Sequence, residues 1–431
     1  MYVFLVFAAI VASIVLGLRF KINIGIPALL FALLIGRYAL GLSFGSVLQF
    51  WPTTIFVQLV IVTLFYSFAT GAGAVSYIAN QTIWLTRKTP RVVPIAFALL
   101  CFILAAIGIP PVGTSMLLYP IFTGYSRKIG IDETYVGVLS IIAGIGGMLS
   151  PTGYLGILVA GIIIEAGLDA PFYSLQIFKY AALTSFILMA AFYFILGLYK
   201  PAPVIAEAEK PGKADRNQKR VLIIILVIVS FMFLPQIVDR LYANPITGFL
   251  KGIDITVLYV IGILACVIAK IGNEREMLKT GVPWNVLILV GGMSCLMSVL
   301  TKAGFVEMTG DALRRIGVTD MPSVLIIFLF VIGSGVLSLF CDGVNVVTPL
   351  FVSLAISLSS VVQFDLALAM AFVPIGALCT GISPLSTGGA LAVSFVEEKR
   401  QNRILRRLLF SAFLSLPMLC VIVLAFSLGK I

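Results

Sequence analysis

The sequence predicts an all-α polytopic membrane protein with two inverted-topology repeats, about ten membrane spans, two re-entrant hairpins and two broken helices. Composition is the first of three supporting observations. Of 431 residues, 61% are hydrophobic and only 11% are charged, and the mean hydropathy is +1.14. Globular domains are nearer half apolar and a quarter charged. The longest polar stretch, residues 199–220, is too short for a soluble domain.

Apolar runs of spanning length are the second observation. About 17–20 apolar residues cross a bilayer. Such runs lie at residues 2–18, 22–42, 54–79, 134–165, 180–198, 221–236, 255–271, 283–300, 366–396 and 408–428. The first run has no basic residues before it and no cleavage motif of small residues, so we expect a retained span and not a signal peptide.

Two further pairs of runs predict re-entrant hairpins. In the first pair, residues 92–109 lead into a turn at 110–113, and the return leg 114–126 is too short to span at 1.5 Å per residue. The Pro110-Pro111 turn could also be a kink between packed helices. The second pair joins 321–340 to 344–362 through a tip at 341–343. Its legs are long enough for two full spans, which stay an alternative.

A helix-breaking stretch that occurs twice is the third observation. Gly144–Gly153 and Cys379–Gly389 interrupt apolar runs with Gly, Pro, Ser and Thr. A break at membrane depth frees backbone groups at a cost of several kcal/mol each, so it is tolerated only where it lines a cavity. Ser150-Pro151 and Ser383-Pro384 are 233 residues apart, as are Trp51 and Trp284. This matched offset predicts two repeats, each with a binding-site break.

The placement of basic residues predicts the orientation. With the N-terminus outside, most of the 29 lysines and arginines fall in loops on the inner side. The predicted division is an N-terminal repeat 1–199, a linker 200–220 on the inner side, and a C-terminal repeat 221–431. The first broken helix then runs outward and the second inward. The net charge of +11 is explained without a nucleic-acid partner. The Arg/Glu cluster 397–407 is expected to be an exposed orientation signal.

Four segments are expected to meet at the membrane midplane: the hairpin tips near 108–115 and 341–348, and the two breaks. None contains Lys or Arg, so an anion would be held by helix N-termini, backbone N–H groups and hydroxyls. The predicted substrate-binding residues are Gly113, Thr114, Ser115, Ser150, Pro151, Thr152, Gly153, Asp342, Gly343, Asn345, Ser383, Pro384, Ser386 and Thr387. Freed carbonyls and hydroxyls also suit sodium, and its predicted ligands are Gly146, Gly147, Thr114, Asp342, Asn345 and Thr380.

Each of these residues has a structural alternative. Ser and Thr in membrane helices often bond their own helix or a neighbouring one. Asp342 is the one carboxylate deep in an apolar region. Such a group usually indicates function, as a sodium ligand, a proton carrier or a substrate contact. It could instead cap the helix that begins at Val344.

Several classes of chemistry find no support in the residues. The chain has no histidine, and its six cysteines are scattered within apolar runs without metal or disulfide spacing. No nucleophile–base pair, metal cluster or nucleotide loop is present. A membrane-embedded enzyme or assembly factor would rest on Asp342 and Cys341 alone. The prediction is therefore a transport protein and not an enzyme.

Two motifs resemble the MatC-type malonate/dicarboxylate carriers, within the wider ion-transporter superfamily that includes divalent-anion:sodium symporters. They are Ser383-Pro-Leu-Ser-Thr-Gly-Gly-Ala-Leu-Ala-Val393 with Arg403-Ile-Leu-Arg-Arg-Leu-Leu409, and Gly146-Gly-Met-Leu-Ser-Pro-Thr-Gly-Tyr-Leu-Gly156 with Leu117-Leu-Tyr-Pro120 before it. The resemblance covers nearly the whole chain. It implies sodium- or proton-coupled uptake of small dicarboxylates by an elevator-like motion, in a homodimer, with tips and breaks lining the site.

The hairpin tips depart from that pattern. The symporters carry a Ser-Asn-Thr type motif at each tip, and neither tip here preserves it. Asp342 is added in the second tip, where it would repel a dianion unless sodium or a proton neutralised it.

The predicted function is secondary active transport of small organic anions, such as malonate or succinate, across a bacterial inner membrane. The alternatives are a membrane subunit that receives substrate from a binding protein, a transporter of a less anionic substrate, and a passive channel. The partners expected are the anion, the lipid bilayer and a second copy of the chain. No cofactor is expected beyond sodium as a possible coupling ion.

Overall fold

The computed structural model describes residues 2–109, 111–200, 210–241, 245, 249–250, 253–304, 308, 322–338, 343–360, 362–383 and 386–429. Within these ranges the chain forms helices joined by short turns, and no described residue lies in a strand. Helices α1 to α10 occupy the first half. They are α1 (Tyr2–Phe20), α2 (Gly25–Tyr38), α3 (Phe44–Leu48), α4 (Thr53–Gly71), α5 (Ala74–Thr86), α6 (Val93–Ala106), α7 (Pro111–Ile129), α8 (Thr134–Met148), α9 (Tyr154–Glu165) and α10 (Ala170–Ile195).

The second half repeats this order. Its elements are α11 (Arg216–Leu241), α13 (Ile255–Ile268), α14 (Glu274–Thr280), α15 (Trp284–Lys302), α17 (Ser323–Leu337), the π-helical turn η3 (Gly343–Val347), α18 (Thr348–Ser359), α19 (Leu366–Cys379), the short turn η4 (Thr380–Ile382), α20 (Thr387–Ser394) and α21 (Glu398–Ser427). Helices α15, α17, α19 and α20 begin within three residues of the positions 233 residues after the starts of α4, α6, α8 and α9. The exact division into inverted repeats stays a prediction.

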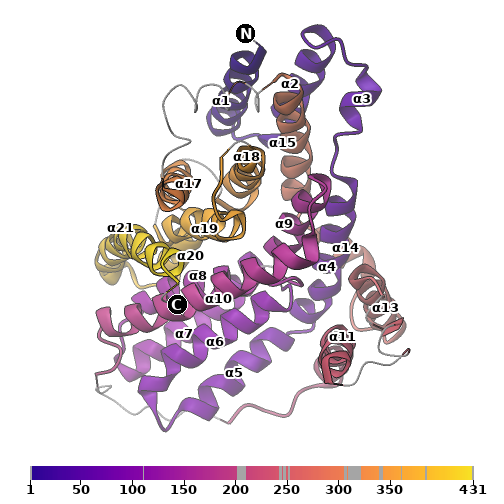
Figure 1. The fold of residues 1–431 in the computed structure, drawn as a ribbon. Coiled ribbons are helices and arrows are strands. Elements are labelled where there is room, and N and C mark those ends of the chain that lie inside the picture. The colour runs from indigo at the N-terminus through magenta and orange to yellow at the C-terminus, as the bar shows by residue number, and fades with distance from the viewer. Residues whose placement is uncertain are drawn as a thin grey trace.

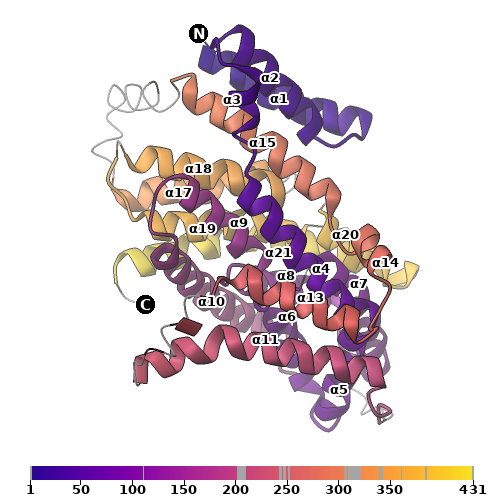
Figure 2. The same ribbon diagram turned by 90° about the vertical axis from the view of Figure 1, so that its right-hand side faces the viewer.

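Helix pairing also recurs between the halves. Helix α6 packs along α8, and α17 packs along α19 in the same way (Figure 1). Two other pairs are exchanged: α2 of the first half packs on α15 of the second, and α13 of the second packs on α4 of the first. Figure 2 shows α4, α13 and α11 lying side by side. Neither half is therefore a separate compact body.

The hydrophobic core has two parts. The larger joins α4–α10 with α11, α13 and α17–α21. The smaller packs α1, α2 and Val47 of α3 against one face of α15. At the α2–α15 crossing, a Cβ on Gly25 would lie 2.2 Å from the carbonyl oxygen of Ile288. Small residues allow such backbone approach in membrane helices, where van der Waals packing drives association.

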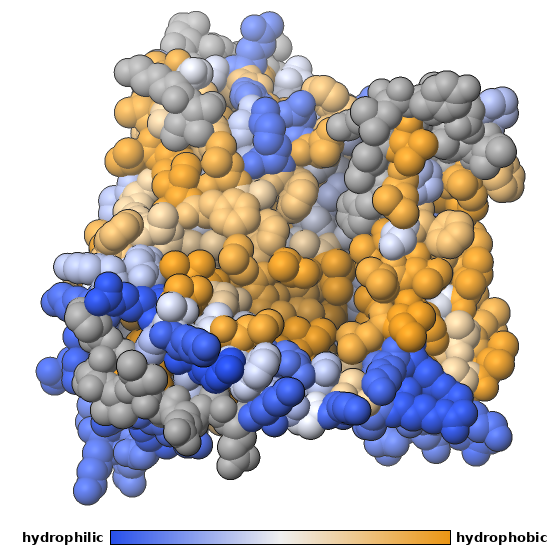
Figure 3. Space-filling model, turned by 90° about the horizontal axis from the view of Figure 1, so that it is seen from below, coloured by the Kyte–Doolittle hydropathy of each residue, from blue (hydrophilic) through white to orange (hydrophobic). Residues whose placement is uncertain are grey.

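The exterior fits a bilayer. Three helical segments in the described part of the chain are long and apolar enough to cross a membrane: residues 44–71, 170–195 and 398–427. Ten shorter apolar helices of 10–17 residues accompany them. Figure 3 shows a broad hydrophobic band with a hydrophilic rim along its lower edge. The protein is an all-α integral membrane protein, as the composition predicts.

Three helix boundaries differ from the sequence prediction. Residues 54–79 are not one span, because Gly73 (φ +70°) separates α4 from α5. Residues 180–198 belong to a helix that already begins at Ala170 after an Asp169 cap. The run 408–428 belongs to α21, which extends back to Glu398 through its charged residues. Hydropathy alone missed these polar helix ends, which lie outside the apolar window.

The first hairpin turn lies earlier than predicted. Pro111 is the first residue of α7, so the return leg has 19 residues, to Ile129, and not the 13 that suggested a leg too short to span. Proline is favoured at this position because its missing N–H needs no partner there. Arg127 and Lys128 extend the helix at its other end, where cations are favoured by the helix dipole.

Candidate functional site

The first predicted break lies where expected, between α8 and α9. The Ser150 and Thr152 hydroxyls both donate to the carbonyl oxygen of Ala106, the last residue of α6, at 2.5 Å each. Both side chains are buried. The last carbonyls of a helix have no intrahelical partner, so these hydroxyls satisfy one of them. They join the break to the hairpin, and Pro151 between them is exposed.

The second predicted break lies between α19 and α20. Ser386 is the N-cap of α20: its hydroxyl accepts from the Gly389 amide at 3.2 Å and donates to the Ser383 carbonyl at 2.7 Å. The Ser383 side chain is buried. Thr380 lies in η4 and Thr387 begins α20. Pro384 lies outside the described residues.

The two breaks have the same backbone geometry. The Gly153 amide donates to the Ser150 carbonyl at 2.9 Å, and the Ser386 amide donates to the Ser383 carbonyl at 2.9 Å. Each of these carbonyls then presses on the first turn of the next helix. A Cβ on Gly156 would lie 1.8 Å from the Ser150 oxygen, and one on Gly389 would lie 2.2 Å from the Ser383 oxygen. The matched glycines in the sequence are explained by this contact.

The first hairpin tip touches the first break. Gly108 at the turn has φ +102°, and a Cβ there would lie 2.7 Å from the Thr152 carbonyl oxygen. Gly113, Thr114 and Ser115 follow in the first turn of α7. The structure therefore brings the predicted residues of tip and break together. The first amides of a helix lack intrahelical acceptors and carry partial positive charge.

The second tip is described only in part. Gly343 begins η3, and a Cβ there would lie 2.9 Å from the Ala377 carbonyl oxygen, near the end of α19. Thr348 donates to the Gly343 carbonyl at 2.7 Å. Asn345 lies within η3. Asp342, the predicted deep carboxylate, lies outside the described residues.

A space opens between α8 and the second break. Along one face of α8, Gly137 lies against Ala392 and Ile141 lies against Gly388. Gly144, about one turn further along this face, is buried, yet no described atom lies within 4 Å of a Cβ placed there. The same holds for Gly381 in η4. Both glycines belong to the predicted site segments.

The two glycines predicted as sodium ligands face packed neighbours instead. A Cβ on Gly146 would lie 2.4 Å from the Ser185 hydroxyl of α10, and one on Gly147 would lie 2.2 Å from the Phe102 carbonyl of α6. Their lack of a side chain lets three helices approach closely. Among the described residues, no group of three or more His, Cys, Asp or Glu could hold a metal ion, so a cation would have to rely on carbonyls and hydroxyls.

Sequence reasoning missed two features around the site. Tyr66 and Tyr259 lie with ring centroids 5.8 Å apart, and the Tyr259 hydroxyl donates to the Ile107 carbonyl at the first tip, at 3.4 Å. Two buried tyrosines within apolar runs gave no periodic signal. Their role is set by the exchanged packing of α4 and α13.

The second missed feature is an ion-pair network. Glu133, whose side chain is 1% exposed, pairs with Arg127 at 3.2 Å and Arg400 at 3.6 Å. Asp132 pairs with Arg403 and Arg407. The cluster 397–407 is therefore more than the exposed orientation signal expected. It ties the α7–α8 loop to α21, and the only signal was the Asp-Glu pair far away in the sequence.

An all-helical membrane fold with matched breaks and hairpin turns defines a class, the secondary transporters, and not an enzyme. The chain belongs to the citrate transporter family (CitMHS), whose profile matches residues 2–373. This assignment agrees with the ion-transporter type of protein. The finer resemblance to MatC-type carriers is not confirmed.

Two solved structures share the fold. The YdaH transporter of Alcanivorax borkumensis is 16% identical with a TM-score of 0.61, covering 89% of this chain and 87% of that chain. MtrF of Neisseria gonorrhoeae, described as illuminating a class of antimetabolite efflux pumps, is 13% identical with a TM-score of 0.55, covering 84% and 80%. No curated protein matches the chain in sequence.

Proposed function

We propose that this protein transports small organic anions carrying two or three carboxylates, driven by a sodium or proton gradient. One observation carries the proposal: the two breaks have the same geometry, and an open space adjoins Gly144 and Gly381 between α8 and the second break. Two independent breaks of this kind are typical of a binding site shared between repeats.

The chemistry of these segments suits an anion. Helices α7, α9 and α20 begin at the first tip and at the two breaks, and their first amides are available to carboxylate oxygens. No lysine or arginine occurs in residues 108–115, 144–153 or 379–389. Binding through backbone dipoles avoids a fixed positive charge that would hold the substrate too tightly for release.

A coupling cation would complete the charge balance. Carbonyls freed at the breaks are hard oxygen donors of the kind that bind sodium. Asp342 offers a carboxylate that could take either sodium or a proton. The cation neutralises part of the substrate charge, so that anion and cation cross together.

The family description supports citrate as one substrate, and the motif resemblance supports malonate and succinate. All three share paired carboxylates on a short carbon chain. We further propose an elevator-type movement within a homodimer of a bacterial inner membrane, with the N-terminus outside. The separate small core of α1, α2, α3 and α15 would supply the static part.

Uptake into proteoliposomes tests the proposal. Labelled citrate, malonate and succinate would be supplied with an inward sodium gradient, with a proton gradient, and with neither. We expect accumulation of at least one acid above its external concentration under one gradient. Equilibration without accumulation would indicate a channel. Transport only when a soluble receptor is added would identify a binding-protein-dependent subunit, and no movement of any acid by folded protein would refute the anion assignment.

A further inference from the structure

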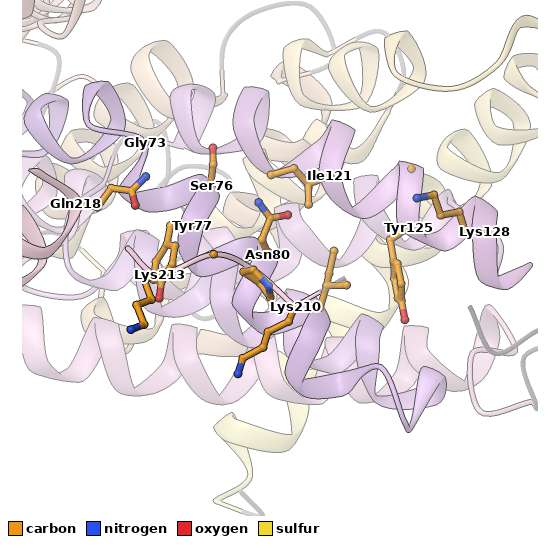
Figure 4. A pocket seen from close by; sticks show the side chains of 14 residues that line it. Gly73, Ser76, Tyr77, Asn80, Ile121, Tyr125, Lys128, Lys210, Lys213 and Gln218 are labelled. Atoms are coloured by element: carbon orange, nitrogen blue, oxygen red, sulfur yellow. The ribbon is translucent and has the colours of Figure 1, made fainter. Parts of the chain in front are cut away.

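A cationic cavity lies apart from the two breaks. It has a volume of about 880 Å³ and lies between α5 and α7, where residues 210–213 and Gln218 of α11 close it (Figure 4). Its wall on α7 is formed by Ile121, Gly124, Tyr125 and Lys128. These residues occupy the half of α7 away from the hairpin tip. The cavity is therefore a different place from the space beside Gly144.

The charge of the cavity is one-sided. Lys128, Lys210 and Lys213 line it, and none of its lining residues is acidic. Across the part of the chain that the structure describes, these three lysines make no ion pair. The neighbouring Arg127, in contrast, pairs with both Glu133 and Glu397 at 3.2 Å. The protein thus neutralises the adjacent arginine internally and leaves the cavity lysines without a counter-ion.

Polar groups that can donate hydrogen bonds accompany the lysines. Ser76 and Asn80 line the cavity from α5. The Tyr125 side chain is only 7% exposed, and its hydroxyl has no hydrogen-bond partner among the described residues. A buried hydroxyl without a partner costs about 1–3 kcal/mol. A bound acceptor at this wall would remove that cost.

The cavity is kept open by a missing side chain. Gly124 lies within α7, and no described atom lies within 4 Å of a Cβ placed on it. A larger residue would project into free volume without a clash with described atoms. Gly124 therefore offers a way to fill the cavity without changing its charge.

We propose that this cavity is a second anion site, which binds a multiply charged oxyanion of the phosphate type. Three ammonium groups supply the charge, and hydroxyl and amide groups supply directional donors. The oxyanion can belong to a soluble molecule or to the head group of an acidic phospholipid, since basic pockets of helical membrane proteins bind such head groups. The proposal stands without the transport site, because it concerns different residues and a different readout.

Calorimetry on purified, delipidated protein in neutral detergent tests the site. One arm titrates inorganic phosphate at constant ionic strength, and the other titrates micelles containing phosphatidylglycerol against phosphatidylcholine. Saturable binding of phosphate identifies a soluble ligand. Binding of phosphatidylglycerol alone identifies a lipid head group.

Two variants and one control decide where the ligand binds. The triple variant Lys128→Ala, Lys210→Ala, Lys213→Ala should weaken binding about 100-fold, since each lysine near a surface contributes about a factor of five. Gly124→Leu should abolish binding with all charges kept. The control, Lys88→Ala, Lys219→Ala, Lys279→Ala, removes the same charge from exposed positions and should bind like the unmodified protein. The absence of saturable binding in both arms overturns the proposal, as does an equal loss in the control or normal binding by folded Gly124→Leu.

Discussion

The carbonyl oxygens of Ser150 and Ser383 each lie against a glycine six residues further along the chain. No side chain fits at these glycines, since a Cβ would lie 1.8 Å and 2.2 Å from the two oxygens. At the first break, two hydroxyls share one acceptor, the carbonyl of Ala106. At the residue scale, the predicted site hydroxyls therefore have structural partners already, while the glycines determine the shape of the site.

Gly156→Ala and Gly389→Ala should each destabilise the protein by about 1–3 kcal/mol, the usual cost of overpacking. Thermal unfolding in detergent measures the effect. Gly144→Ala is the matched control, because it adds the same methyl group at a buried glycine with free space. Equal melting temperatures for all three variants would contradict the contact.

Gly144→Leu should fold but fail to transport, because its side chain would occupy the space beside the second break. Gly144→Ala should keep part of the activity. Uptake in proteoliposomes, normalised to folded protein, measures both. Full transport by the leucine variant would place the substrate elsewhere.

Ser150→Ala and Thr152→Ala should each have a small effect alone, because the other hydroxyl still donates to Ala106. The double variant leaves that carbonyl without either donor and should lower the free energy of unfolding by about 1–3 kcal/mol. A double-mutant cycle by denaturant unfolding measures the coupling between the two positions. Purely additive effects would mean that the hydroxyls act separately, for example on substrate.

Helix ends carry the connections between elements. The α7–α8 loop and the start of α21 are far apart in sequence, but Asp132 and Glu133 pair with three arginines of α21. The pair of loop and helix lies between α7–α8, which bear the first tip and the start of the first break, and α21, which follows the second break. Both site segments are thereby fixed to one ion-pair network.

Glu133→Gln should destabilise the protein by about 1–2 kcal/mol. Breaking a fully buried ion pair costs more, but Arg127 and Arg400 are 33% and 53% exposed and can be solvated. Glu398→Gln is the control, since Glu398 is exposed and forms no ion pair with a described residue. Melting temperatures at low and high salt measure the difference. An equal, salt-independent effect of both variants would argue against the network.

The exchange of helices between the halves determines the shape of the whole molecule. Helices α2 and α13 each pack on the other half, so the small core around α15 and the large core are both built from residues of each half. Basic residues from α7, the 210–213 segment and the start of α21 lie around one end of this assembly. The orientation proposed from the sequence places that end inside the cell.

Cysteine labelling tests this orientation. In a background without native cysteines, Lys213→Cys should be protected from a membrane-impermeant maleimide in right-side-out vesicles, and Leu428→Cys should react. The reverse pattern would invert the topology. Labelling after permeabilisation controls for accessibility of each thiol.

The sequence by itself determined the class and the position of the breaks. Apolar runs and helix breakers act locally: a bilayer offers no partner for a freed backbone group, so Ser-Pro and Gly in an apolar run must mark a break. Spacing then related Ser150 to Ser383. The same local logic failed at helix ends, where Pro111 starts α7 early and Gly73 divides a long run.

Tertiary structure alone decided what each break residue contacts. Which carbonyl accepts the Ser150 hydroxyl, which neighbour excludes a Cβ at Gly156, and which loop pairs with the 397–407 arginines all depend on residues distant in sequence. The exchange of α2 and α13 brings those residues together. Periodicity records which face of a helix is apolar, but not which helix lies against it, because many apolar faces are interchangeable until close packing selects one.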